Sequence, residues 1–413
     1  MRNSRKNVRK KSYCFLLCMA TSLLLTGCWS RIEPKKLSLT NSVLFDVLDN
    51  GEIQITKENM KPSGESAGKG GPGGEKSSAD LLISRGKTLA EAVRDELNGR
   101  TLFGGFIKAR LLTEDFAKSG LVPTMDFLTR DHLVDETPFL AVVKGNDPER
   151  VYASDVGLSE MVGDYIDDMA DTQPNTKSES VYITTLDFIK DYFADGKQPV
   201  MGLIEIAENE PRSITNPQTG SQDPQNGSEK KYRLVYSGLA AFKDDKLAGF
   251  MDRIETRAYN FIVNELKSAV ISLPDGITAA KVLKSGSKIK TEIKNGQTTI
   301  DVNIKVAFSI IQTGRAVEAN QISQLKTLEQ EFNKQLEAEL SASIQKVQQE
   351  FKSDIFGFGT YVKIQHPNEW KDMKNNWDEL FSKATVNVKV NSTITMMGET
   401  ERSIRMEKQT HDS

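Results

Sequence analysis

The chain has 413 residues, of which 38% are hydrophobic, and a formal net charge of −3. This length is enough for two or three folded domains. Residues 1–27 hold six basic and no acidic side chains, so the remainder carries −3 − 6 = −9. An acidic remainder argues against a nucleic-acid-binding protein, and against adsorption to anionic lipid through overall charge, because both require a basic surface.

The N-terminal segment 1–27 is typical of a secretory signal peptide, in which a basic leader precedes a short apolar core. Here the core is SYCFLLCMATSLLLTG, and it ends at the tetrapeptide Leu-Thr-Gly-Cys, residues 25–28. This tetrapeptide resembles the bacterial lipobox, which implies cleavage between Gly27 and Cys28 and a covalent diacylglycerol with palmitate-type chains on Cys28. The alternative is an uncleaved N-terminal helix that ends in a chance cysteine.

The cysteine count is consistent with this hypothesis. The chain has three cysteines; Cys14 and Cys18 would be removed with the signal peptide, and Cys28 would be acylated. The mature chain then has no thiol available for a disulfide, a thiolate metal site or a catalytic nucleophile. We therefore expect no cofactor other than the covalent lipid.

In the first half of the chain, strand-like and helical patterns alternate. Two strands, EIQIT and DLLIS, are separated by a Gly- and Ser-rich segment, residues 61–78, which we expect to be a flexible loop. Thr88 and Glu91 have the spacing of a capping box at the start of a helix over 87–99. The elements expected next are a strand at 106–112, short helices at 113–120 and 122–131, a buried strand at 138–145, helices at 158–171 and 185–194, and a strand at 200–207.

A second polar segment, residues 208–231, is rich in Pro, Asn and Gln and is expected to be a linker between domains. Beyond it we expect a hairpin at 232–251 with its turn at 243–246, a helix at 252–266, and a hairpin at 288–311 around Asn295-Gly296. A long helix is expected at 319–351. Its apolar stripe lacks a strict heptad, which favours a core helix lying on a sheet over a coiled coil. A helix at 368–381 and a strand at 384–396 follow.

These patterns predict an α+β protein with more than one domain, in which antiparallel or mixed sheets built from hairpins carry helices packed on them. The predicted organisation is a signal peptide 1–27, an N-terminal α+β region 28–207, a linker 208–231, a C-terminal α+β domain 232–400 and a polar tail 401–413.

No motif indicates a catalytic centre. GESAG, residues 64–68, matches the nucleophile elbow around Ser66, but the KGGPGG that follows cannot start the helix that this motif requires. The four aspartates within 164–171 lack the glycine turn of a calcium loop, and a solvated helix face is favoured. His132, His366 and His411 are isolated, without the paired spacing of a zinc site.

Several stretches resemble the spore germination lipoproteins, the C subunits of nutrient germinant receptors (Ger(x)C type). The mature chain opens with Cys28-Trp29, and GKTLAEAVRDELNGRTLFGG and PFLAVVKG are similar to segments of that family. The resemblance extends in order from Cys28 to about Gly398. The matching positions are Glu114, Ala117, Gly120, Pro123, Asp126, Phe127, Arg130 and Asp131 in the first half, and Gly238, Ala240, Phe242, Lys243, Gly249, Asp354, Gly357, Trp370, Trp377, Phe381 and Gly398 in the second.

The resemblance implies a non-enzymatic scaffold or interaction subunit, needed for nutrient-triggered spore germination. Its partners would be the integral membrane A and B subunits of the receptor, and it would lie on the outer face of the inner spore membrane. Two alternatives remain. A lipid-anchored solute-binding protein of a transporter would share the lipobox, but it usually has parallel βαβ lobes rather than hairpins. An exported hydrolase would use Ser66.

Overall fold

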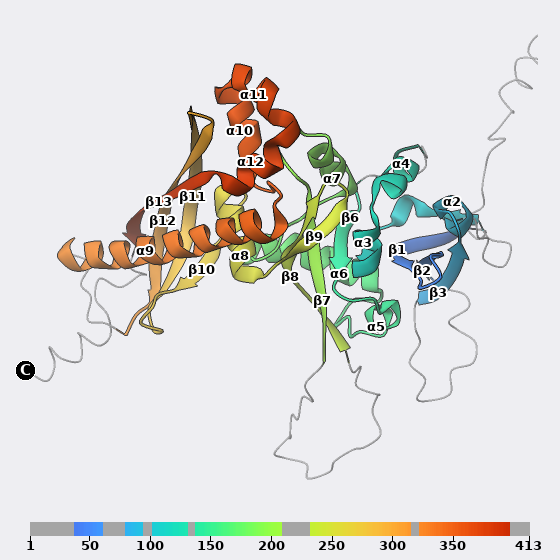
Figure 1. Cartoon of the computed structure of the whole chain (residues 1–413). Helices are drawn as coiled ribbons and strands as arrows, with labels where there is room; N and C mark the ends of the chain where they lie inside the picture. Colours follow the sequence, from blue (N-terminus) through green and yellow to red (C-terminus); the bar gives the residue numbers. More distant parts are fainter. Residues whose placement is uncertain are drawn as a thin grey trace, which may run out of the picture.

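The structure is a computed structural model, and it describes residues 37–60, 79–93, 101–130, 137–208, 232–314 and 322–396. The signal peptide, Gly27, Cys28, Ser66 and Asp131 lie outside the described residues, as do the segments 61–78 and 209–231. Two sheets lie next to each other in an elongated molecule (Figure 1). The α+β class with mixed sheets that the sequence predicts is confirmed.

The first sheet has nine strands, in the order β3-β2-β1-β5-β6-β7-β8-β9, with β4 paired to β1. The central strands β1, β5, β6 and β7 run parallel, and the flanking pairs are antiparallel. Strands β1 and β4 were not among the predicted elements. The strands are β1 (Leu37–Val47), β2 (Ile53–Met60), β3 (Ala79–Gly86), β4 (Thr101–Phe103), β5 (Ala109–Thr113), β6 (Phe139–Val143), β7 (Val200–Glu208), β8 (Tyr232–Lys243) and β9 (Lys246–Met251).

Helices cover both faces of this sheet, because its central strands are apolar on both sides. On one face, α2, α3 and α7 pack on a core that includes Phe116, Phe188 and Phe242. On the other face, α5 and α6 pack on a core that includes Phe139 and Ile166. The bounds are α2 (Leu89–Val93), η2 (Gly104–Phe106), α3 (Glu114–Ser119), α4 (Val122–Arg130), α5 (Pro148–Tyr152), α6 (Val162–Thr176) and α7 (Thr185–Tyr192).

These helices differ from the prediction in several details. Helix α5 was not among the predicted elements, and α6 spans Val162–Thr176 rather than 158–171. The Thr88 hydroxyl accepts from the Glu91 amide, but the Glu91 carboxylate accepts from the Lys87 amide, so the second half of the capping box is displaced by one residue. On α6, Asp164 accepts from the Asn41 side chain and Asp167 pairs with Lys108 at 3.6 Å, so only part of the acidic helix face is solvated.

The first sheet continues on both sides of segment 208–231. Strand β7 ends at Glu208 and pairs antiparallel with β8, which begins at Tyr232. The hairpin of β8 and β9 turns where the sequence predicts, since Lys243 pairs with Lys246 and Asp244 has φ 55°. The strands on either side of the segment that was expected to separate two domains, β7 and β8, are therefore hydrogen-bonded neighbours in one sheet.

The second sheet has four strands, in the order β10-β11-β12-β13, of which only β12 and β13 are parallel. Its hairpin turns at Asn295 and Gly296, which have φ 52° and 77°, as an Asn-Gly turn requires. The long helix α9 buries most of the predicted stripe on this sheet, from Leu328 onward, with Phe332 stacked on Phe308, while Ile322 is exposed. The bounds are α8 (Arg253–Ile262), β10 (Ala269–Ser272), β11 (Ala279–Lys294), β12 (Gln297–Gln312), α9 (Ile322–Lys346) and β13 (Thr385–Met396).

The prediction of one helix at 368–381 is wrong. Helix α9 ends in a π turn, η3 (Val347–Phe351), and the chain then forms α10 (Phe358–Gln365), α11 (Pro367–Met373), η4 (Lys374–Asn376) and α12 (Trp377–Lys383). The break lies at Asn376, whose φ of −122° is not helical. Asparagine favours such positions because its side chain competes with the helix for backbone hydrogen bonds.

Strands β2 and β3 are paired up to the two ends that residues 61–78 connect, since Met60 lies opposite Ala79. We therefore expect that residues 61–78 can be replaced by Gly-Asn-Gly-Ser with a change of less than about 1 kcal/mol in the free energy of unfolding, since loop length contributes only weakly. Urea denaturation of both proteins measures this change. A much larger loss would mean that the segment packs on the fold.

Candidate functional site

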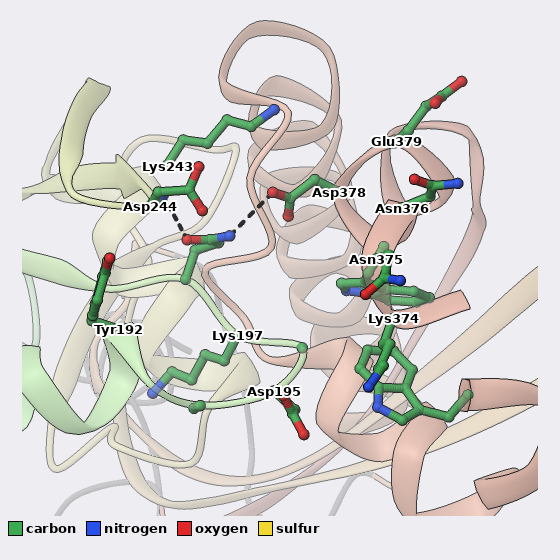
Figure 2. A pocket seen from close by; sticks show the side chains of 15 residues that line it. Tyr192, Asp195, Lys197, Lys243, Asp244, Lys374, Asn375, Asn376, Asp378 and Glu379 are labelled. Atoms are coloured by element: carbon green, nitrogen blue, oxygen red, sulfur yellow. Dashed lines mark hydrogen bonds between the residues drawn. The ribbon is translucent and has the colours of Figure 1, made fainter. Parts of the chain in front are cut away.

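A groove of about 470 Å³ lies between one end of the first sheet and the C-terminal helices α11 and α12. Three parts of the chain form it: the loop after α7, the turn between β8 and β9, and the segment that leads into α12 (Figure 2). We call it the junction groove. Its lining residues are Tyr192, Ala194, Asp195, Gly196, Lys197, Gln198, Lys243, Asp244, Trp370, Lys374, Asn375, Asn376, Trp377, Asp378 and Glu379.

Gln198 links the three parts of the groove. Its side-chain amide donates to Asp378 Oδ2 at 3.1 Å, and its side-chain oxygen accepts from the Asp244 amide at 2.8 Å (Figure 2). Its backbone amide donates to the Asp354 carbonyl at 2.8 Å. One residue of the connection between α7 and β7 thus holds a turn of the first sheet and two segments of the C-terminal helical region.

Asp354 is fully buried below the groove. Its Oδ2 accepts from the Gly359 amide and from the Trp377 indole N–H, both at 2.8 Å. Burial raises the pKa of Asp354 to about 6, while these two donors act in the opposite direction. The carboxyl group therefore connects the chain before α10 with the first residue of α12. Because it is buried away from water, its neutral, protonated form is favoured.

Two glycines permit the close approach of the loop after α7 to helices α10 and α12. A Cβ on Gly196 would lie 2.5 Å from the Gly359 carbonyl carbon, and a Cβ on Gly359 would lie 2.5 Å from Trp377 Nε1. Both neighbours, Gly359 and Trp377, also donate hydrogen bonds to Asp354. The backbone contact is completed by the Thr360 amide, which donates to the Gly196 carbonyl at 3.2 Å.

Several residues singled out in the sequence also lie at the junction. Gly249 leaves room for the ring of Phe351, which a Cβ would approach to 2.3 Å. Gly238 has φ +93° and forms a bulge in β8, so that Leu239 after it faces the core shared by both sheets. The carbonyl of the buried Phe242 accepts a hydrogen bond from Ser353.

Lys243, Trp370 and Trp377 line the groove itself. The two indoles are in contact, with ring centroids 5.5 Å apart. Burial raises the pKa of Asp378, and the nearby Lys243 opposes that shift. Residues far apart in the sequence that were chosen only by resemblance are thus brought together by the fold.

Asp126 and Arg130, two of the predicted site residues in the first half of the chain, do not line the junction groove. Asp126 and Arg130 form an exposed ion pair at 2.7 Å on α4, on the face of the first sheet that α2 and α3 also cover. Asp131, Gly27 and Cys28 lie outside the described residues, so their predicted roles stay predictions.

Sequence reasoning missed the loop that joins the other parts of the groove. Gly196 and Gln198 lie in a short connection between α7 and β7, and nothing in their local pattern distinguishes them from ordinary turn residues. The one available signal was the Asp-Gly pair at 195–196, which indicates a turn. Their partners in the C-terminal helices, Thr360 for Gly196 and Asp378 for Gln198, are more than 150 residues away in the chain.

The groove is polar and carries both signs of charge. Lys197 pairs with Asp191 at 2.7 Å, and Asp195 at its rim pairs with Lys363 at the same distance. Such a surface is suited to polar contacts with a protein segment or a small charged molecule.

Comparisons with known proteins agree with the resemblance seen in the sequence. Residues 30–206 match the family model "Spore germination protein N-terminal domain", and residues 237–398 match "Spore germination B3/ GerAC like, C-terminal". The chain is 26% identical to spore germination protein B3 of Bacillus subtilis (strain 168) over 387 residues, which cover 91% of this chain and 94% of that protein. It is 25% identical to spore germination protein A3 of the same organism, covering 93% and 97%.

A solved structure shares the fold. The crystal structure of the GerBC protein matches 86% of this chain and 96% of its own, with a TM-score of 0.52 and 18% identity. Together, the two family models span both sheets and the junction between them. The chain belongs to the Ger(x)C family of spore germination proteins.

The raised pKa of Asp354 predicts how the free energy of unfolding depends on pH. Its pKa in the folded protein, about 6, lies above the ordinary value of 3.8, so the folded state retains a proton that the unfolded state has released. The contribution to stability is present below about pH 4 and is lost as the pH rises through 6, with a total of about 3 kcal/mol. We expect Asp354→Asn to have a flatter dependence of unfolding free energy on pH than the parent protein.

Urea denaturation from pH 4 to pH 7 measures both dependences. Asparagine keeps an oxygen that can accept from Gly359 and Trp377, so the variant tests the charge rather than the contacts. Other buried carboxyl groups with raised pKa, such as Glu58 and Asp191, change stability in the same direction in both proteins. Parallel curves for the two proteins would contradict the prediction.

Proposed function

We propose that this chain is the lipid-anchored C subunit of a spore nutrient germinant receptor, acting as a non-enzymatic scaffold or interaction subunit. The observation that carries the proposal is the ordered match of both family models from residue 30 to residue 398. The relatives are named as spore germination proteins. The lipobox-like end of the signal peptide supplies the means of membrane attachment.

The partners we propose are the two integral membrane subunits, A and B, of the receptor, with this chain on the outer face of the inner spore membrane. Among the described residues, no helix is long and apolar enough to cross a bilayer. A stable membrane location for this chain would therefore use the two acyl chains on Cys28 and contacts with its partners.

The junction groove is a candidate for a partner contact. It lies between the first sheet and the C-terminal helices, and its mixed charges suit a polar segment of another subunit.

The test is purification of the chain, tagged at its C-terminus, from membranes of dormant spores in mild detergent, followed by mass spectrometry. The proposal expects two co-purifying polytopic subunits and a diacylated Cys28 as the first residue. An acylated chain accompanied by a transporter permease would favour a solute-binding lipoprotein instead. An N-terminal peptide without lipid would reject the anchor.

A further inference from the structure

The second sheet has one face on which lysine dominates. Helix α9 covers its inner face, and we call the opposite face of β11, β12 and β13 the basic face. The strands of this sheet contain seven lysines and two acidic residues. The lysines are Lys281, Lys284, Lys288, Lys290, Lys294, Lys305 and Lys389, and the acidic residues are Glu292 and Asp301.

Strand register places these side chains on one side of the sheet. Inner positions of β12, such as Val302, Ile304 and Val306, are buried, so the alternate positions point outward. Lys288 lies opposite Asn303, which in turn lies opposite Lys389. The neighbouring rows pair Lys290 with Asp301 and Lys305 with Gly286 and Asn391, and all seven lysines are exposed.

No described element covers this face. A Cβ built on Gly286, at the centre of the lysine rows, would meet no atom within 4 Å. The free edge at β13 is instead occupied by α9, where Glu337 accepts from the Val390 amide and Glu329 from the Ile394 amide. The sheet is thus closed on its inner face and along this edge, and open on the basic face.

The positive charge of the face is not neutralised within the described chain. Lys294 forms an ion pair with Glu292 at 2.6 Å, and Asp301 accepts from Asn387 at 2.9 Å. For the other six lysines the described residues provide no carboxylate partner. Seven positive and two negative charges leave +5 on one face of a mature chain that carries −9, so the overall charge conceals a strong local asymmetry.

The composition of the face identifies its partner. Cores of protein interfaces are enriched in Tyr, Trp and Arg and depleted in Lys, and the strands of this sheet contain none of those three residues. Lysine on flexible stems, without bidentate or stacking groups, suits a diffuse anionic surface. At the β10 end, Val270, Leu283 and Ile311 are 45–51% exposed and add apolar contact of the kind found at membrane interfaces.

We infer that the basic face lies on an anionic phospholipid surface as a second, electrostatic membrane contact. This inference rests on the membrane location proposed above, and it revises the expectation that charge opposes lipid binding. Only eight residues, 29–36, separate Cys28 from β1, a reach of about 30 Å. Strand β1 and the second sheet lie toward opposite ends of the molecule (Figure 1). A protein anchored and bound in this way lies lengthwise along the bilayer.

The experiment uses the mature chain with Cys28→Ala, so that no acyl chain contributes. Binding is measured by co-sedimentation with vesicles of phosphatidylcholine, with and without 30 mol% phosphatidylglycerol, at two salt concentrations. Each lysine near an anionic surface contributes about fivefold to binding. A face variant changes four of them to glutamine: Lys288, Lys290, Lys305 and Lys389. The control makes the same change at four exposed lysines elsewhere: Lys177, Lys326, Lys334 and Lys371.

We expect the parent and the control to bind only the anionic vesicles, more weakly at high salt, and the face variant to bind at least about 100-fold more weakly. Circular dichroism and urea midpoints verify that all three are folded. Absence of binding by the parent, or equal loss in the control, would overturn the inference and leave an acidic protein surface as the occupant. Because neither acylation nor the receptor subunits are present, failure here is separate from failure of the proposed function.

Discussion

Trp377→Ala is expected to lower the free energy of unfolding by about 4 kcal/mol, the typical cost of truncating a buried aromatic side chain. The indole is almost fully buried between Trp370 and Phe381 in the core that both sheets share. Its N–H is also one of the two donors to the buried Asp354. Its removal leaves a cavity and a carboxyl group with one donor fewer, at the seam of the molecule.

The two tryptophans provide a matched control. Both are 4% exposed, but the Trp370 indole N–H has no hydrogen-bond partner among the described residues. Trp377→Phe should therefore cost about 2 kcal/mol for the lost hydrogen bond to an acidic group, whereas Trp370→Phe should cost less. Urea denaturation at pH 7 of the soluble Cys28→Ala chain measures all three variants. Equal costs for the two phenylalanine variants would show that the bond to Asp354 is unimportant.

Cys28→Ala is expected to remove the chain from the membrane fraction and to lower nutrient-triggered germination strongly. Two acyl chains hold a protein at a bilayer far longer than one, since each buried methylene contributes about 0.8 kcal/mol. Without them the chain retains only contacts with its partners and the basic face. The measurements are fractionation of spore membranes and the rate of germination after nutrient addition.

The leader contains its own control for that experiment. Cys18→Ala changes a cysteine of the same signal peptide but leaves the lipobox-like tetrapeptide intact, so membrane location and germination should not change. A Cys28→Ala chain that fractionates as soluble, and yet supports germination at the parental rate, would show that the anchor is dispensable.

Much of the local structure follows from the sequence, because it depends on neighbours in the chain. The Asn295-Gly296 turn, the short helix α3, which the Thr113 hydroxyl caps, and most of the apolar stripe of α9 lie where the pattern predicts. Each is decided by left-handed backbone, a capping hydroxyl or a helical repeat of apolar residues, and these are properties of a few adjacent residues.

Elements were misjudged where the tertiary structure overrides the pattern. Strand β1 lies in the middle of its sheet, and its polar residues Asn41, Ser42 and Asp46 are buried, so it lacks the alternation of a half-exposed strand. The single helix expected at 368–381 is broken at Asn376, where Trp377 turns toward Asp354. In both cases distant partners satisfy polar groups that local reasoning assigns to solvent.

The sequence by itself determined the α+β class, the signal peptide hypothesis, the family resemblance and the acidic overall charge, since these depend on composition and order. Only the tertiary structure decided that Gly196, Gln198, Asp354 and Trp377 meet in one groove, because their contacts join segments far apart in the chain. It also decided that lysines of three strands share one face. The register between paired strands, together with the alternation of side chains along each strand, places lysines that are scattered in the sequence on the same side of the sheet.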